Sequence, residues 1–263
     1  MSAVRVGAVA AEPSALVHRR VLPVMGTVVS LALRGPNATG AAADLAWREV
    51  SRDLALADEV FSTWREDSAV NRWGRGELAL TDAPPELAEV LALAEEARLA
   101  SHGAFDIAAT RSSYGGGPDP SGVVKGWAVQ RAAAALERLA GTDYCLAAGG
   151  DMVCRTRRPG ADPWQVGIED PRDPTRLVAT VPVANGAVAT SGSARRGAHV
   201  LDPRTGRPPA DLLQVTVLAP DLTWADIDAT AAFVLGAEAG EWLAGRGRAG
   251  VLVGADGTAS VLG

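Results

Sequence analysis

The sequence predicts an α+β fold: one compact unit of two closely packed mixed halves. Of the 263 residues, 48% are apolar and 21% are charged, as in a globular chain that buries a large core. Helical patterns prevail in the first 140 residues, and short strand-like segments prevail after them. The turn-rich residues 112–121 lie near this change and mark a possible internal boundary.

The N-terminal elements follow from local composition. Residues 1–21 are expected to form a tail, and residues 22–263 a single domain. Residues 22–33 are rich in β-branched side chains and end at Arg34-Gly35-Pro36, which predicts a strand closed by a turn. Met25-Gly26-Thr27 interrupts this strand.

Two helices are expected next, with a loop between them. Asn37 or Thr39 is a candidate N-cap for a helix that runs to about Val60. A second helix should begin after Pro84-Pro85, because proline is favoured in the first helical turn. Residues 61–77 are expected to form the loop.

The remaining elements alternate strands with two helices. A helix is expected over residues 122–139, directly after the boundary, and a late one over residues 224–235, with a possible extension to residue 243. Short apolar runs predict strands at residues 144–148, 165–168, 177–183, 187–190, 213–218 and 250–253.

Composition and charge exclude several classes of protein. The formal net charge of −6 provides no positive field for a nucleic-acid backbone, and no apolar run is long enough for a membrane span. The two cysteines, Cys145 and Cys154, lie in strand-like segments and are too few for a disulfide framework or a four-thiolate zinc site. The first 20 residues have the reverse of a signal peptide's charge order, so we expect a cytoplasmic, reducing location.

Three polar clusters, at residues 189–192, 199–206 and 225–230, follow strands or begin a helix, where rigid elements present side chains to ligands. Taken alone, the stretch from Asp202 to Gly206 is more typical of a plain turn than of a ligand site. Asp226 and Thr230 are four residues apart, so a helix places their oxygens on one face, which suits Mg²⁺. The alternative is that Asp226 interacts with the positive end of the helix and Thr230 packs.

The glycine-rich segment from Gly115 to Lys125 leads into a helix and ends in a lysine. Backbone amides, a helix N-terminus and an ammonium group together suit a phosphate. The segment matches neither the Walker A pattern nor the Rossmann fingerprint. A linker is the alternative.

Eight motifs in order carry more information than any one of them. From about residue 22 to residue 262 the chain resembles the ApbE family of FAD:protein FMN transferases. The motifs are Met25-Gly26-Thr27, Phe61-Ser62-Thr63-Trp64, Gly103-Ala104-Phe105-Asp106, Asp119-Pro120-Ser121-Gly122-Val123-Val124-Lys125-Gly126, Gly149-Gly150-Asp151, Thr190-Ser191-Gly192, His199-x-x-Asp202-Pro203-x-Thr205-Gly206 and Ala225-Asp226-x-x-x-Thr230.

The resemblance implies an ApbE-like fold with the flavin site between the two halves. It implies metal ligation by the Gly122 carbonyl, Asp226 and Thr230, and catalytic roles for His199 and Asp226. His199 is a candidate proton acceptor or flavin-orienting group. Contacts with FAD are implied for Met25, Trp64, Ala104, Phe105, Asp106, Asp119, Lys125, Thr190 and Leu201.

The reaction implied by the resemblance is Mg²⁺-dependent transfer of FMN from FAD to a Ser or Thr hydroxyl of an acceptor flavoprotein, with release of AMP. Two alternatives remain open: an FAD-binding or flavin-storing protein without transferase activity, and a Mg²⁺-dependent FAD pyrophosphatase that gives FMN and AMP. Retention of Asp119, His199, Asp226 and Thr230 together favours catalysis.

Overall fold

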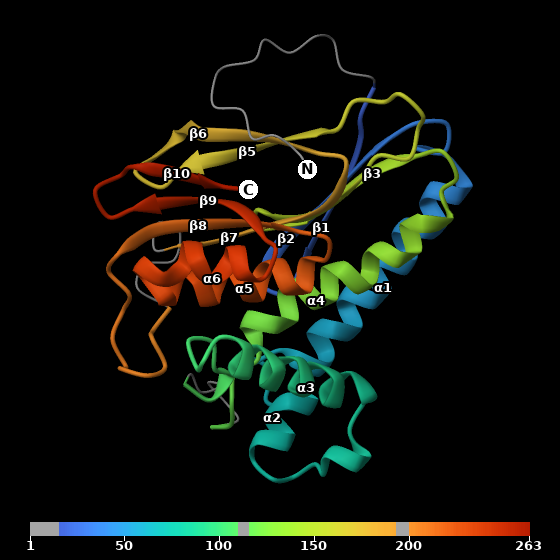
Figure 1. Ribbon diagram of the computed structural model, residues 1–263. Helices are drawn as coiled ribbons and strands as arrows, with labels where there is room; N and C mark the ends of the chain where they lie inside the picture. The colour runs from blue at the N-terminus through green and yellow to red at the C-terminus, as the bar shows by residue number, and fades with distance from the viewer. Residues whose placement is uncertain (1–15, 110–115, 193–199) are drawn as a thin grey trace.

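The computed structural model describes residues 16–109, 116–192 and 200–263. An eight-stranded sheet forms its centre, with helices on one face and a two-stranded hairpin on the other (Figure 1). All neighbouring strands are antiparallel. In spatial order the strands are β1 (His18–Val24), β2 (Thr27–Arg34), β3 (Asp143–Ala148), β4 (Asp151–Arg155), β7 (Asn185–Gly192), β8 (Leu212–Ala219), β9 (Ala249–Gly254) and β10 (Ala259–Leu262).

The first two strands form a hairpin, so the prediction of one strand over residues 22–33 was wrong. Met25 and Gly26 both have positive φ angles, of 56° and 66°, which reverse the chain in a two-residue turn. β1 begins at His18, before the predicted start of the domain at residue 22.

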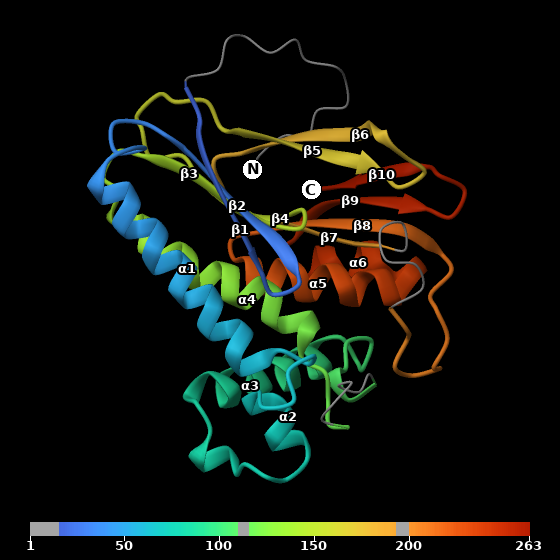
Figure 2. The same ribbon diagram turned by 180° about the vertical axis from the view of Figure 1, so that it is seen from behind.

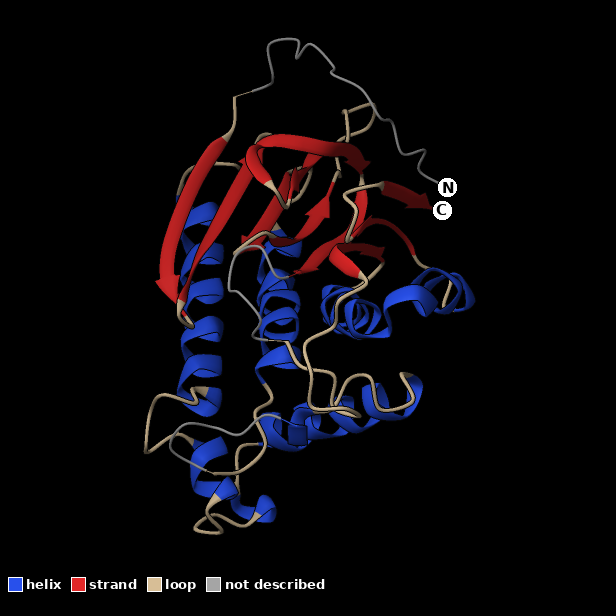
Figure 3. Cartoon of the chain, turned by 90° about the vertical axis from the view of Figure 1, so that its left-hand side faces the viewer, coloured by secondary structure: helices blue, strands red, loops and turns tan. Residues whose placement is uncertain are grey.

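The helices form a layer under the sheet, as Figures 2 and 3 show. α4 (Ser121–Ala133) packs against both α1 (Ala41–Phe61) and α5 (Leu222–Leu235). The other helices are α2 (Ala69–Gly74), α3 (Pro85–Ala100) and α6 (Ala239–Gly245), with short 3-10 turns η1 (Leu80–Asp82), η2 (Ile107–Ala109), η3 (Ala134–Arg138) and η4 (Gly236–Glu238). Among the described residues, no helix is both long enough and apolar enough to cross a membrane.

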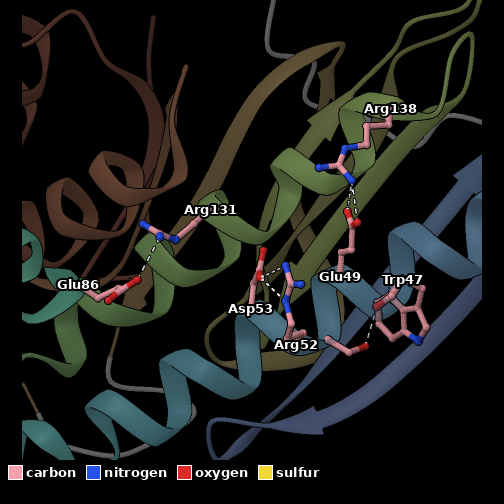
Figure 4. Close-up of polar contacts among 8 residues, drawn as sticks. Trp47, Glu49, Arg52, Asp53, Glu86, Arg131 and Arg138 are labelled. Carbon is pink, nitrogen blue, oxygen red and sulfur yellow. Dashed lines mark hydrogen bonds and ion pairs between the residues drawn. The ribbon is translucent and has the colours of Figure 1, made fainter. Parts of the chain in front are cut away.

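Apolar packing holds this layer to the sheet. Leu54 of α1, Leu136 of η3 and Leu31 of β2 belong to one core cluster and are almost completely buried. Figure 4 shows the polar edge of the layer, where Arg138 Nη1 lies 2.7 Å from Glu49 Oε1. Exposed ion pairs of this kind contribute at most about 1 kcal/mol each, so burial dominates the stability of the helix layer.

The opposite face of the sheet carries a hairpin of β5 (Trp164–Asp170) and β6 (Asp173–Val183). A second apolar cluster, which includes Val181 of the hairpin and Cys154 and Val188 of the large sheet, joins the two. The hairpin therefore has a fixed position over the sheet.

The parts of the chain before and after residues 112–121 share one sheet, because β2 pairs with β3. The α+β class is confirmed. Of the stretch predicted as a boundary, residues 112–115 lie outside the described residues.

Three local predictions were wrong. The N-cap of α1 is Gly40 and has no side-chain cap bond, while the Asn37 side chain donates to the Ala140 carbonyl instead. The predicted loop 61–77 contains α2, which Ser68 caps by accepting from the Asn71 amide. The late helix does not continue beyond Leu235, because the chain breaks at Gly236 with a φ of 61° before α6 begins.

Candidate active site

Two cavities meet at the first turn of α4. The larger, of about 470 Å³, lies between the β3–β4 turn, the tip of the β5–β6 hairpin, the end of β7 and helix α5. The smaller, of about 150 Å³, lies between the β1–β2 turn and the end of α1 with the loop that follows it. Ser121 and Lys125 line both, so an extended ligand could pass from one cavity to the other beside these residues.

At this junction the Lys125 ammonium lies between two carboxylates. Its Nζ pairs with Asp151 Oδ2 and lies 3.1 Å from Asp226 Oδ1. The second oxygen of each carboxylate accepts a backbone amide: Asp151 Oδ1 from Thr190 at 2.8 Å, and Asp226 Oδ2 from Gly126 at 3.0 Å. Both carboxylate side chains are only 4% exposed. The backbone therefore fixes the two carboxylates, and each presents its other oxygen to the same cation.

Burial and neighbouring charge shift the pKa values in this cluster. Burial raises the pKa of Asp226 to about 6, against the opposing effect of Lys125, and the nearby charge of Asp151 adds to the rise. Burial lowers the pKa of Lys125, but the two carboxylates raise it by more, so it lies above its ordinary value. Lys125 is thus a permanent cation at neutral pH.

Glycines allow this cluster to form. A Cβ atom at Gly126 would lie 2.7 Å from the Leu222 carbonyl oxygen and 2.8 Å from Asp226 Cβ, so α4 and α5 approach this closely only because position 126 has no side chain. Gly149 and Gly150 have φ angles of 59° and 112° and form the tight turn that makes Asp151 the first residue of β4.

The predicted helical pair lies as expected. Asp226 and Thr230 both belong to α5 and both line the larger cavity. The Thr230 hydroxyl is 2.9 Å from the Ser191 hydroxyl of β7. Asp228 points away and forms ion pairs with Arg246 at 2.9 Å and Arg248 at 2.7 Å.

The oxygen donors around the larger cavity suit a small, hard cation. Carboxylate and hydroxyl oxygens from Asp226 and Thr230 are ligands that Mg²⁺ accepts, and Gly122 lines the same cavity. The Lys125 ammonium shows that the space between the Asp151 and Asp226 carboxylates accommodates a positive charge. Over residues 16–109, 116–192 and 200–263, no three His, Cys, Asp or Glu side chains gather in a metal-binding arrangement. A divalent ion at Asp226 would therefore rely on hydroxyl, carbonyl, water or phosphate oxygens as well.

Several residues predicted to contact FAD lie at the cavities. Met25 and Trp64 line the smaller one, and the Trp64 side chain is 76% exposed. Lys125 lines both, and Thr190 lines the larger. These four positions are consistent with the prediction.

Other predicted contacts lie outside both cavities. Ala104 and Phe105 are buried. The Phe105 ring packs against Gly122, and a Cβ atom added at Gly122 would lie 3.1 Å from the ring. Asp106 accepts the Ala108 amide at 2.8 Å, and Asp119 accepts the amide and hydroxyl of Ser121 at the start of α4.

Leu201 does not line either cavity, but the preceding residue, Val200, lines the larger one. His199 lies outside the described residues. These assignments stay predictions.

The larger cavity is also lined by Asp151, Ser121 and Ser191, which were not predicted as site residues. Asp151 directly follows Gly149 and Gly150. This glycine pair was the sequence pattern that could have indicated a tight turn with the Asp151 side chain at the site. Its pairing with Lys125 depends on a contact between β4 and α4 that no local pattern specifies.

Comparisons with known proteins agree with the motif pattern. The model of the ApbE family matches residues 25–114 and 117–253. A FAD:protein FMN transferase of Klebsiella pneumoniae (strain 342) is 27% identical over 252 residues, covering 72% of this chain and 71% of that protein. One of Escherichia coli K12 is 37% identical over 130 residues, covering 46% of this chain and 37% of that protein, so the matched part is well under half of this relative.

Solved structures show the same fold. The ApbE protein of Thermotoga maritima has a TM-score of 0.81 at 22% identity, covering 94% of this chain and 97% of that one. The flavinyl transferase ApbE of Pseudomonas stutzeri has a TM-score of 0.79 at 23% identity, covering 94% and 95%. With most of its length matched by the family model and its fold shared with these structures, this chain belongs to the ApbE family.

Proposed function

We propose that this protein transfers the FMN part of FAD to a Ser or Thr hydroxyl of an acceptor protein, with Mg²⁺, and releases AMP. The name FAD:protein FMN transferase, carried by relatives from several bacteria, supports this activity. The site supports it independently through the placement of its charges.

The observation that carries the proposal is the position of Lys125 where the two cavities meet. FAD has two bulky ends joined by two negatively charged phosphates. A ligand of this shape suits two adjoining cavities with a permanent cation at their junction. The first turn of α4 adds the positive end of a helix beside the same point, because Ser121 begins that helix and lines both cavities.

The chain's own residues would orient the reacting groups. The Gly126 amide holds Asp226 so that Oδ1 points to the junction, and Asp226, Thr230 and the Gly122 carbonyl would hold the divalent ion. When bound, Mg²⁺ supplies Lewis-acid stabilisation of phosphate charge. Lys125 would counter the negative charge that builds up as the pyrophosphate bond breaks.

The transfer step follows from this arrangement. The acceptor hydroxyl oxygen attacks the phosphorus of the FMN half, the bond from that phosphorus to the bridging oxygen breaks, and AMP leaves. The hydroxyl proton passes to a base, and His199 is the residue that we propose for that role. Holding both substrates in one site replaces an encounter in solution with an oriented reaction.

The test is to incubate the full chain with FAD, Mg²⁺ and a purified candidate acceptor protein, and to follow the acceptor by intact mass and AMP by chromatography. One FMN adduct per AMP supports the transferase. AMP and free FMN without an adduct, in the presence of an acceptor that another flavin transferase modifies, would indicate a pyrophosphatase. Bound FAD that stays intact with that same acceptor would indicate storage.

The Asp226→Asn variant tests the role of the carboxylate, because it keeps the shape of the side chain but removes its charge. It should lower turnover far more than FAD affinity if the carboxylate acts mainly in the transition state. Equal losses in both would contradict that role.

A further inference from the structure

The two cysteines of this chain face each other across neighbouring strands. Cys145 of β3 and Cys154 of β4 are direct partners in the antiparallel register, and their sulfur atoms are 3.6 Å apart. Both are free thiols. The sequence contains no other cysteine, so any internal disulfide must join this pair.

The backbone geometry permits a bond between them. Directly opposed residues of an antiparallel pair have Cα atoms about 4.5 or 5.5 Å apart, depending on the hydrogen-bonding pattern. Disulfides join Cα atoms that are about 4.4–6.8 Å apart. The two side chains also lie on the same face of the sheet, since their sulfur atoms are already in contact. A disulfide therefore needs side-chain rotation but no rearrangement of the strands.

The two thiols differ in exposure and in chemistry. Cys145 is partly exposed, whereas Cys154 is completely buried. The Cys154 S–H donates to Cys145 Sγ, which lowers the pKa of Cys145 by more than burial raises it, and the positive charges of Arg19 and Arg34 lower it further. The same contact raises the pKa of Cys154. Because the thiolate is the nucleophile, Cys145 is the attacking sulfur and Cys154 the one that resolves the intermediate.

A third sulfur atom connects this pair to the larger cavity. Cys145 Sγ donates to Met152 Sδ at 3.8 Å, and Met152 lines that cavity. Met152 also follows Asp151, the partner of Lys125. The thiol pair therefore contacts a residue of the cavity wall.

We propose that Cys145 and Cys154 form a redox-active dithiol that a small disulfide such as oxidised glutathione converts to an internal disulfide, and that this conversion changes the FAD cavity through Met152. The Cys145 thiolate attacks the small disulfide and releases one glutathione thiol. Cys154 then attacks the mixed disulfide, the Cys145–Cys154 bond forms and the second glutathione thiol leaves. Two protein thiols are oxidised and one glutathione disulfide is reduced to two thiols, which take up the two protons.

The sulfur atoms must approach each other by about 1.5 Å to reach the roughly 2.05 Å length of a disulfide. Cys145 then has no S–H to donate to Met152, so the Met152 side chain loses its partner and repacks at the cavity wall. The effect on FAD rests on the proposed function, whereas the thiol chemistry does not.

The first experiment equilibrates the full chain with graded ratios of reduced and oxidised glutathione, quenches with acid, alkylates the remaining thiols and measures intact mass. The wild type should lose both alkylatable thiols together without retaining a glutathione adduct. The Cys154→Ala variant should stop at one glutathione adduct on Cys145, and the Cys145→Ala variant should remain unmodified. Two alkylatable thiols in the wild type at every ratio, or a persistent glutathione adduct on it, would overturn the proposal.

The second experiment compares FAD affinity of the oxidised and reduced wild type. The affinities should differ by about twofold to fivefold, as expected when a few packing contacts change. The double variant Cys145→Ala/Cys154→Ala should bind FAD equally at both glutathione ratios. Equal affinities of the two wild-type forms would overturn the link through Met152. Because the mass experiment contains no FAD, failure of the transferase proposal would leave its result intact.

Discussion

The ammonium nitrogen of Lys125 lies 3.1 Å from Oδ1 of Asp226, and the same nitrogen pairs with Asp151. Three charged groups from α4, α5 and β4 thus meet at the junction of two cavities.

The Lys125→Met variant should lower FAD turnover by about 10²–10³-fold, because it removes a fixed positive charge from the place where phosphate charge develops. It should also lower the free energy of unfolding, since two buried carboxylates lose their shared cation. AMP release and urea unfolding measure the two effects. Arg131→Met on the same helix is the control, because its exposed guanidinium lies away from both cavities. Wild-type turnover in Lys125→Met would contradict the role.

Asp151 should act as a positioning residue for Lys125. The Asp151→Asn variant keeps an oxygen to accept the Thr190 amide but loses its charge, so the fold should remain and kcat should fall by about tenfold with a smaller change in KM. Asp151→Ala should in addition lower the free energy of unfolding by about 1–3 kcal/mol, because the Thr190 amide loses its partner. Steady-state kinetics with thermal unfolding separates these effects. Unchanged kinetics in Asp151→Asn would rule out positioning.

The close approach of α4 and α5 at Gly126 can be tested by adding one methyl group. Gly126→Ala should lower the free energy of unfolding by about 1–3 kcal/mol and reduce turnover, because the new Cβ atom would overlap the Leu222 carbonyl and the Asp226 side chain. Gly240→Ala in α6 is the matched control: an added Cβ atom there meets nothing within 4 Å, so stability should stay equal or rise. Similar stability of the two variants would contradict the packing argument.

Trp64 should contribute to FAD binding and little to folding, since it lines the smaller cavity and is 76% exposed. Trp64→Ala should weaken FAD binding by roughly tenfold through lost stacking and leave the melting temperature unchanged, whereas Trp64→Phe should keep most of the affinity. Leu99→Ala, at an exposed apolar position away from both cavities, is the control. Fluorescence titration of FAD measures the change, and an unaltered Kd in Trp64→Ala would refute the contact.

Asp143 gives a pH dependence of stability. Its carboxylate is completely buried, accepts the amides of Arg157 and Arg158, and lies 2.9 Å from Arg158 Nη2 and 3.2 Å from Arg34 Nε. Burial raises the pKa of Asp143, but the hydrogen bonds from Arg157 and Arg158 and the charge of Arg158 lower it by more, so the folded-state pKa lies below the unfolded value. The stabilisation is therefore present above the unfolded pKa of about 3.9 and is lost as the pH falls through the folded-state pKa.

The measurement is the difference in free energy of unfolding between the wild type and Asp143→Asn, taken by urea titration from pH 7 downward. It should be constant near neutral pH and shrink below about pH 4. A difference that grows as the pH falls would show that the pKa is raised.

Local patterns predicted most of the elements. The apolar runs located the strands from β5 to β9, and Pro84-Pro85 located the start of α3. Local patterns failed where the bounds of an element depend on tertiary packing. The possible extension of the late helix to residue 243 does not occur, because the chain breaks at Gly236, and β10, which was not predicted, pairs with β9.

The sequence by itself determined the α+β class, the family motifs and the shared face of Asp226 and Thr230, because four-residue spacing on a helix is a local property. Only the tertiary structure decided that Asp151 pairs with Lys125 and that Cys145 faces Cys154. The first contact needs β4 to lie against α4, and the second needs the register of β3 on β4. Both are set by the packing of the whole core, which no single segment of the chain encodes.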